Sequence, residues 1–216
     1  MLDVTEKREA QRQVTVDRIL DAFERVLLRD GVRNVGANAV MKEAGISKPQ
    51  LYKYFGGIPG LIREWGRRRP FWPTHEELSP PGEEAYDDPK VQLKRRLIRL
   101  AKMLRDRPIA LEVLADELVA PEGEISKAFA ELRQKRGEAD REKFGPDHPV
   151  RQRENFRLVH VMFAAIVYFA LRARRNPQLQ GIDLHSEEGW NDTIKMIEEI
   201  IDDSILASKV RELLGS

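Results

Sequence analysis

Apolar residues recur every three or four positions along most of this 216-residue chain, which is the spacing of a helix with one buried face. The first such stripe consists of Val16, Ile19, Leu20, Phe23, Val26 and Leu27. Comparable stripes follow within residues 93–104, 111–118, 125–132, 150–175 and 187–213. No segment alternates apolar and polar residues as a half-buried strand would. The pattern predicts an all-α protein of about nine helices.

A segment rich in proline and acidic residues divides the chain. Residues 73–90 contain four prolines and six acidic side chains, a composition typical of a linker or an exposed loop. We therefore expect an amino-terminal head at 13–72, a linker at 73–90 and a helical body at 91–216. Within the head, Thr15 or Asp17 is expected to cap the first helix and Gly31 to end it.

The charges are divided in the same way. The formal net charge is only +1, but residues 1–69 hold 14 Lys or Arg and 9 Asp or Glu, a net of +5. Residues 70–216 hold 23 and 27, a net of −4. A basic head on an acidic body favours an anionic partner for the head.

The segment 36–55, GANAVMKEAGISKPQLYKYF, carries the most specific pattern. Two short helices meet at a turn containing Gly45, and Ser47 with Gln50 has the spacing of a capping box. Apolar side chains would hold this pair of helices against the first helix, while polar, basic and aromatic ones stay exposed. Gln can pair with an adenine edge, Lys with guanine or phosphate, and a Tyr hydroxyl with phosphate. The pattern indicates a helix-turn-helix, although similar helix pairs occur in proteins that bind nothing.

The head resembles the DNA-binding domain of the TetR family of bacterial transcriptional regulators. The resemblance covers about residues 13–65 and is carried by Ile19-Leu20, Ala22-Phe23, Gly31, Ala44-Gly45-Ile46-Ser47 and Leu51-Tyr52-Lys53-Tyr54-Phe55. It implies a three-helix head that contacts a palindromic operator in double-stranded DNA. The residues expected to contact DNA are Asn38, Lys42, Ser47, Lys48, Pro49, Gln50, Tyr52, Lys53 and Tyr54.

Three positions depart from the family pattern. Val35 stands where Thr often caps the second helix, Asn38 where an Arg often contacts phosphate, and Ile58-Pro59 where a Lys commonly begins the fourth helix. These residues remove charge from typical phosphate contacts. The alternative function is therefore a helical ligand-binding or scaffold dimer that has lost DNA affinity.

The resemblance also implies a homodimer, a repressor and release from DNA by an unknown small-molecule effector. In such a dimer the last two helices of each subunit, here 150–175 and 187–213, would form a four-helix interface with the partner. The expected interface residues are Phe169, Trp190, Ile194, Ile197, Ile201 and Ile205. The expected pocket residues are Met103, Phe129, Phe156, His160, Phe163 and Tyr168, although aromatic residues at helical spacing are more often core.

Signals for other classes are weak. The four histidines are scattered without metal-ligand spacing, and no catalytic or phosphate-loop motif is present, so we expect no enzyme, metal or cofactor. The chain has no cysteine. The longest apolar stretch, 158–171, falls short of the roughly 20 residues that span a bilayer, so we expect a cytoplasmic bacterial protein without membrane attachment.

Overall fold

The structure, a computed structural model, describes residues 4–83, 89–119, 122–144 and 153–214, and these form two compact units. The first unit comprises residues 1–71 and 112–135, and the second comprises 72–111 and 136–216. The described residues contain ten α-helices and one short hairpin, so the predicted all-α fold is confirmed.

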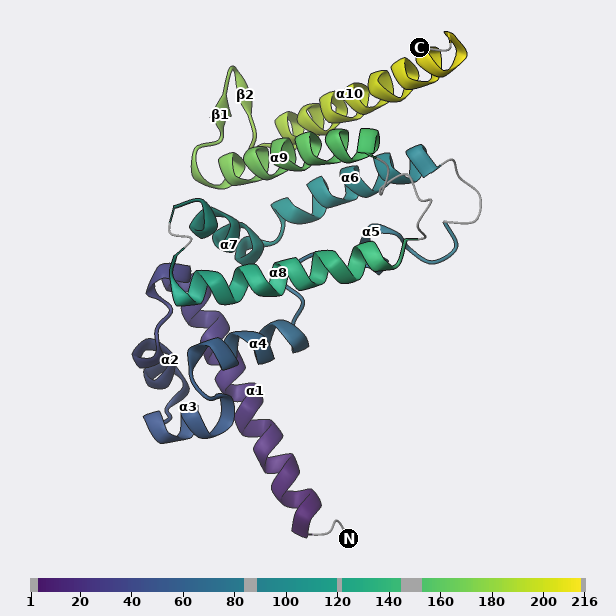
Figure 1. Cartoon of the computed structure of the whole chain (residues 1–216). Coiled ribbons are helices and arrows are strands. Elements are labelled where there is room, and N and C mark those ends of the chain that lie inside the picture. The colour runs from purple at the N-terminus through teal and green to yellow at the C-terminus, as the bar shows by residue number, and fades with distance from the viewer. Residues whose placement is uncertain (1–3, 84–88, 120–121, 145–152, 215–216) are drawn as a thin grey trace. The chain divides into compact units, whose positions relative to one another are not determined.

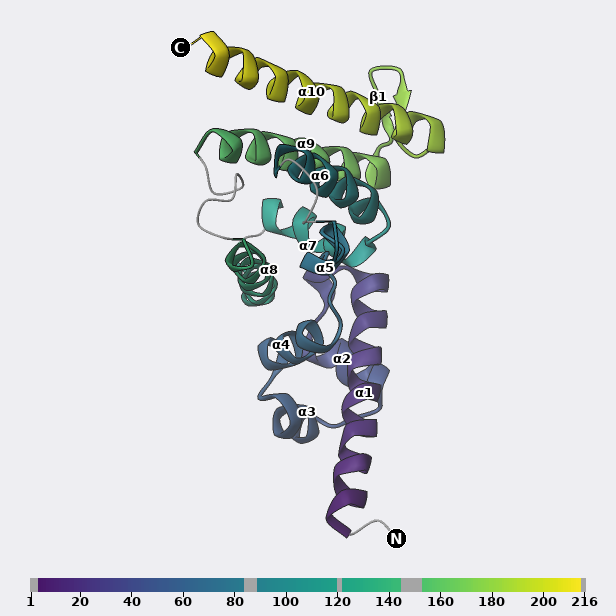
Figure 2. The ribbon, with the colours of Figure 1, turned by 90° about the vertical axis from the view of Figure 1, so that its right-hand side faces the viewer.

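The first unit is built around α1 (Val4–Asp30). The short turn η1 (Val32–Asn34) leads to α2 (Ala37–Ala44), α3 (Lys48–Phe55) and α4 (Ile58–Arg68). The apolar stripe of α1 is buried as predicted, and α2 packs on α1 and α3 (Figures 1 and 2). Phe129, from the segment that returns to this unit, lies among the rings of Phe23, Trp65 and Phe71.

The helix α1 begins earlier than expected. It starts at Val4, whereas the sequence predicts capping by Thr15 or Asp17. The hydroxyl of Thr15 instead donates to the carbonyl of Gln11, one turn back in the same helix (2.9 Å). Residues 6–13 contain Glu, Lys, Arg, Gln and Ala, which favour helix, and no Gly or Pro interrupts them.

The second unit contains α5 (His75–Leu78), α6 (Pro89–Arg105), α9 (Arg153–Arg175) and α10 (Glu187–Leu214). Parts of α7 (Pro108–Val119) and α8 (Glu124–Glu142) belong to each unit. Within the second unit, α6 packs against both α9 and α10, and both views show α6 beside α9 (Figures 1 and 2).

Two elements were not expected. The helix α5 lies inside the segment predicted as linker, where Thr74 and Glu77 form a capping box. This helix raises the number from about nine to ten among the described residues. The hairpin of β1 (Gln178–Leu179) and β2 (Ile182–Asp183) turns through Gln180 and Gly181, both with positive φ. Its two-residue strands are too short to leave an alternating pattern in the sequence.

Candidate nucleic-acid interface

The start of α3 is fastened by the predicted capping box. The side-chain oxygen of Gln50 accepts hydrogen bonds from the Ser47 amide (2.8 Å) and the Ser47 hydroxyl (3.1 Å). This contact orients the first turn of the helix and satisfies one of its unpaired amides. It also occupies the Gln50 oxygen, so only the amide nitrogen of that side chain is left to donate to a base.

The outer face of α3 is polar, basic and aromatic. Leu51 is fully buried, whereas Lys48, Pro49, Tyr52 and Lys53 are exposed at positions that share one face of the helix. The Lys48 ammonium lies 5.9 Å from the centre of the Tyr52 ring, within cation–π range. Among the predicted contact residues, Ser47 and Gln50 are also exposed and Tyr54 is half-buried.

Asn38 and Lys42, the two candidates on α2, are exposed one turn apart. The helix begins at Gly36, which provides no side-chain hydrogen bond to its first turn. Val35, where the family often has a capping Thr, is completely buried. The side-chain cap is therefore absent at this helix, as the sequence indicated.

The turn between α2 and α3 depends on a left-handed residue. Gly45 has φ of 62°, a conformation that glycine adopts without steric penalty. The amides of Gly45 and Ile46 donate to the carbonyls of Lys42 and Met41, closing α2. This turn presents α3 immediately beside α2.

The motif contains one acidic residue, and its charge is neutralised. The Glu43 carboxylate accepts from the Arg25 Nε at 2.8 Å and from an Arg29 nitrogen at 2.9 Å. The hydrogen bond from Arg25, followed by that from Arg29, holds the pKa of Glu43 below its usual value. The surface of the motif therefore lacks an unpaired carboxylate that would repel phosphate.

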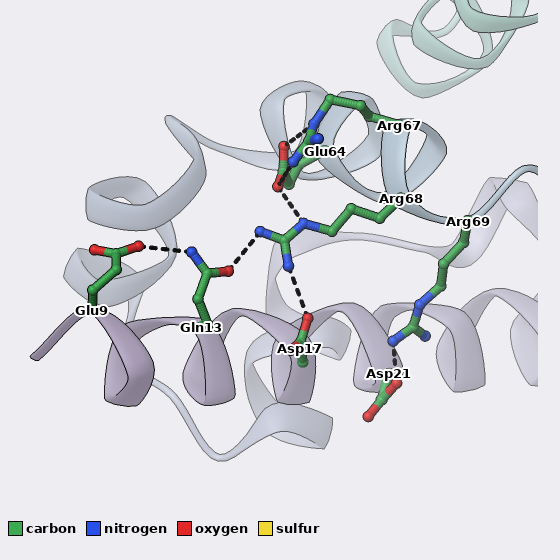
Figure 3. Close-up of polar contacts among 8 residues, drawn as sticks. All are labelled: Glu9, Gln13, Asp17, Asp21, Glu64, Arg67, Arg68 and Arg69. Carbon is green, nitrogen blue, oxygen red and sulfur yellow. Dashed lines mark hydrogen bonds and ion pairs between the residues drawn. The ribbon is translucent and has the colours of Figure 1, made fainter. Parts of the chain in front are cut away.

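The arginine run at the end of α4 is bound to α1. Arg68 donates to Glu64, to Asp17 (2.9 Å) and to Gln13 (2.9 Å), while Arg69 reaches Asp21 (Figure 3). Arg67 also donates to Glu64, and this bond, ahead of that from Arg68, holds the pKa of Glu64 below its usual value. A run of this kind could have been freely solvated or directed at DNA. Here its guanidinium groups are paired with carboxylates of the protein itself.

The predicted pocket residues are dispersed. Phe129 lies in the core of the first unit, with no exposed surface, because three other aromatic rings surround it. His160 and Tyr168 are exposed on α9. Met103 and Phe163 are half-buried in the second unit, where the Phe163 ring lies 6.2 Å from that of Trp72. The side chain of Phe156 lies outside the described part.

The predicted interface residues on α10 face inward. Trp190, Ile194, Ile197 and Ile201 are buried within the protomer, because this stripe of α10 faces its own unit. Phe169 is half-buried, and the side chain of Ile205 lies outside the described part. The large apolar residues that α9 and α10 expose are instead Val161, Tyr168, Met196 and Ile200. Of these four, the sequence singled out only Tyr168, as a pocket residue, because apolar residues lie on more than one side of these helices.

Two further observations concern the described ranges as a whole. None of their helices has the combination of length and hydrophobicity needed to cross a bilayer. No three His, Cys, Asp or Glu residues in these ranges gather as a metal site would require.

Taken together, the glycine turn, the capping box of α3 and its basic exposed face define a helix-turn-helix protein. Residues 19–64 match the family model described as bacterial regulatory proteins, tetR family. An uncharacterized HTH-type transcriptional regulator of Mycobacterium tuberculosis, known from two strains, is 26% identical over 163 residues, which cover 73% of this chain and 76% of the relative. A TetR-like transcriptional regulator from a Rhodococcus species has the same fold, with a TM-score of 0.55 at 20% identity over 94% of this chain and 97% of that one.

The chain carries, at residues 19–64, a DNA-binding head that matches the TetR family of bacterial transcriptional regulators, as its motif residues suggested. It is a DNA-binding regulator of transcription, and its relatives are regulators.

Proposed function

We propose that this regulator is a homodimeric repressor that binds a palindromic operator through α3 and leaves it when a small-molecule effector binds. In this proposal the head at 13–72 binds DNA, the body at 91–216 binds the effector and the partner, and the protein acts in the bacterial cytoplasm without catalytic activity. The observation that carries the proposal is the exposed face of α3, where Lys48, Pro49, Tyr52 and Lys53 lie together on a capped helix. Such a helix fits the major groove, and its side chains can reach base edges.

The proposal assigns different roles to the exposed side chains. Lys48, the first residue of α3, and Tyr52, one turn further on, contact base edges, and Pro49 contacts a thymine methyl. Lys53, Asn38 and Lys42 contact the phosphate backbone, which positions the helix without reading sequence. Gln50 donates from its amide nitrogen, because its oxygen stays in the capping box.

Selection from random duplexes with the purified full-length protein tests the proposal. Two copies of α3 related by a two-fold axis would read half-sites about one helical turn apart, so a palindrome is the expected product. Failure to enrich any motif, even at low salt, would support the alternative of a dimer without DNA affinity.

Replacing Lys53 by Ala tests the phosphate contact. We expect weaker operator binding, and a plot of log affinity against log salt that is flatter by about one for each phosphate that Lys53 neutralises. Fluorescence anisotropy across a salt series measures both quantities. An unchanged affinity and slope would remove Lys53 from the interface.

The dimer is proposed to form through the exposed apolar residues of α9 and α10. Val161 and Tyr168 lie on one face of α9, seven residues apart, and Met196 and Ile200 lie one turn apart on α10. The two helices pack against each other within the unit, so their exposed faces can form one surface. Burying this surface against a second copy removes apolar area from water.

A double substitution, Met196→Glu with Ile200→Glu, is expected to convert the dimer to a monomer, because four carboxylates would be buried at a two-fold interface. Sedimentation velocity measures the change. Leu118→Glu is the matched control, because Leu118 is exposed on α7 in the first unit and should leave the dimer intact. A double variant that stays dimeric would place the interface elsewhere.

The effector is proposed to bind in the second unit, with Met103 and Phe163 among its contacts. These two of the predicted pocket residues are half-buried there, so they have surface left to offer a ligand. A ligand can shift the regulator only if it binds the two arrangements of the dimer with different affinity. A compound that stabilises the free protein and lowers operator affinity identifies the effector.

A further inference from the structure

The amino-terminal part of α1 extends beyond the core of its unit. The first buried residue of this helix is Val16, and the side chains from Thr5 to Thr15 are exposed or half-exposed. About three turns of helix, roughly 18 Å, therefore continue past the packed core. Figures 1 and 2 both show this part of α1 continuing past α3.

A groove lies between this part of α1 and the neighbouring helices α3 and α4. It consists of two clefts of about 380 and 470 Å³, which adjoin each other because Arg12 and Tyr54 line both. The larger cleft is lined by Arg8, Gln11, Arg12, Lys53 and Tyr54. The smaller is lined by Arg12, Gln13, Val16, Tyr54, Phe55, Gly60, Arg63, Glu64, Arg67 and Arg68. We call the two clefts together the α1 groove.

The charge of the α1 groove is strongly positive. Glu64 is the one acidic residue in its lining, and that carboxylate is bound by Arg67 and Arg68 (Figure 3). Among the described residues, Arg8, Lys53 and Arg63 have no ion-pair partner. Arg12 has a distant one, Glu9 at 3.8 Å, on the exposed surface. These four cations differ from Arg68 and Arg69, whose charge is balanced within the protein.

The shape of the α1 groove fits an extended polyanion better than a small anion. Its four exposed cations come from three helices: Arg8 and Arg12 lie one turn apart on α1, Lys53 is on α3 and Arg63 is on α4. The polar side chains of Gln11 and Tyr54 belong to the same lining. Lys53 belongs both to the groove and to the exposed face of α3. A strand of DNA that leaves the major groove beside α3 would therefore continue into the α1 groove.

We propose that the α1 groove binds the phosphate backbone of the DNA that flanks each half-site, through Arg8, Arg12 and Arg63. The contact is independent of sequence and lengthens the footprint of each protomer beyond the bases that α3 reaches. The contact also adds positive charge near the phosphates. This charge compensates for Asn38 and Ile58, which are neutral at two positions where the family often has a cation. The inference rests on the proposed operator binding and adds a partner surface to it.

The test compares the full-length protein with a variant carrying Arg8→Ala and Arg12→Ala. Two duplexes serve as probes. The long one is the selected operator with one helical turn of flanking DNA, about ten base pairs, on each side, and the short one is the same operator without the flanks. We expect the double variant to bind the long duplex about tenfold more weakly, with a salt slope flatter by about two per protomer. Removing the flanks should weaken the wild-type protein much more than the double variant, which keeps only Arg63 of the three flank contacts.

Two controls separate this effect from loss of charge or structure. Arg18→Ala removes an exposed arginine from the same helix outside the groove and should bind both probes as the wild type does. Arg8→Lys with Arg12→Lys keeps the charge and should restore the slope. Far-UV circular dichroism of each variant checks that α1 is still helical.

The outcomes separate the inference from the function on which it rests. A double variant with wild-type affinity and salt slope on the long duplex overturns the inference, while operator binding by α3 stands. A double variant that loses as much affinity as the wild type when the flanks are removed also overturns it. Wild-type protein that binds neither probe contradicts the proposed function itself.

Discussion

Phe129→Ala should lower the free energy of unfolding of the first unit by about 3–5 kcal/mol, the usual range for removing a buried aromatic ring. The ring has no exposed surface, and its centre lies 5.9–6.3 Å from those of Phe71, Trp65 and Phe23. Its loss leaves a cavity at the centre of an aromatic cluster and removes the edge-to-face contacts with Trp65 and Phe71. Urea unfolding followed by tryptophan fluorescence measures the change.

Phe129→Leu is the control for this prediction. Leucine keeps most of the apolar volume, so Phe129→Leu should lower the free energy of unfolding by less than half as much as Phe129→Ala does. The substitution also distinguishes core from pocket. Removing a partly exposed ring that lined an effector site would lower the free energy of unfolding by less than about 1 kcal/mol and would instead weaken effector binding.

Gly60→Ala should destabilise the head by about 2–3 kcal/mol, which corresponds to a melting temperature lower by roughly 6–10 °C. A Cβ at this position would lie 1.7 Å from the carbonyl oxygen of Phe55, which is backbone and cannot rotate away. To relieve the contact, α4 must move away from the end of α3. We therefore expect operator affinity to fall as well, because α3 loses its support.

A Gly→Ala substitution in another helix is the matched control, and there we expect the melting temperature to rise instead of fall. Gly137 lies in α8, and a Cβ there meets nothing within 4 Å. Because Ala favours helix over Gly by up to about 1 kcal/mol, Gly137→Ala should raise the melting temperature slightly. Differential scanning calorimetry compares the two variants. A Gly60→Ala protein as stable as the wild type would show that α3 and α4 do not depend on this approach.

Local chemistry explains what could be predicted about the head. Gly45 and Gly56 both have positive φ, and Ser47 and Gln50 form their capping box at the start of α3. Such signals act within a few residues, so they can be read without knowing the fold. The start of α1 could not be read in this way, because its first turns are stabilised by propensity, and Thr15 bonds back within the helix.

The roles of charged residues depended on which distant segments they meet. A run such as Arg67–Arg69 at a helix end is more often solvated than bound to DNA, yet Arg68 reaches Asp17 and Arg69 reaches Asp21, about fifty positions earlier. Arg8 and Arg12 attract no notice in a polar segment, yet they lie beside Lys53. Long-range charge pairing has no sequence period, so it became visible only in three dimensions.

By itself, the sequence determined that this protein is all-helical and that a glycine turn joins α2 to α3. These features depend on apolar periodicity and on backbone preferences, which are local properties of the chain. The tertiary structure alone decided which apolar stripe of α10 is buried and which is left exposed, which arginines are neutralised, and that Phe129 belongs to the core of the first unit. Those outcomes depend on the packing of segments far apart in sequence, because burial and ion pairing are set by the neighbours that the fold brings into contact.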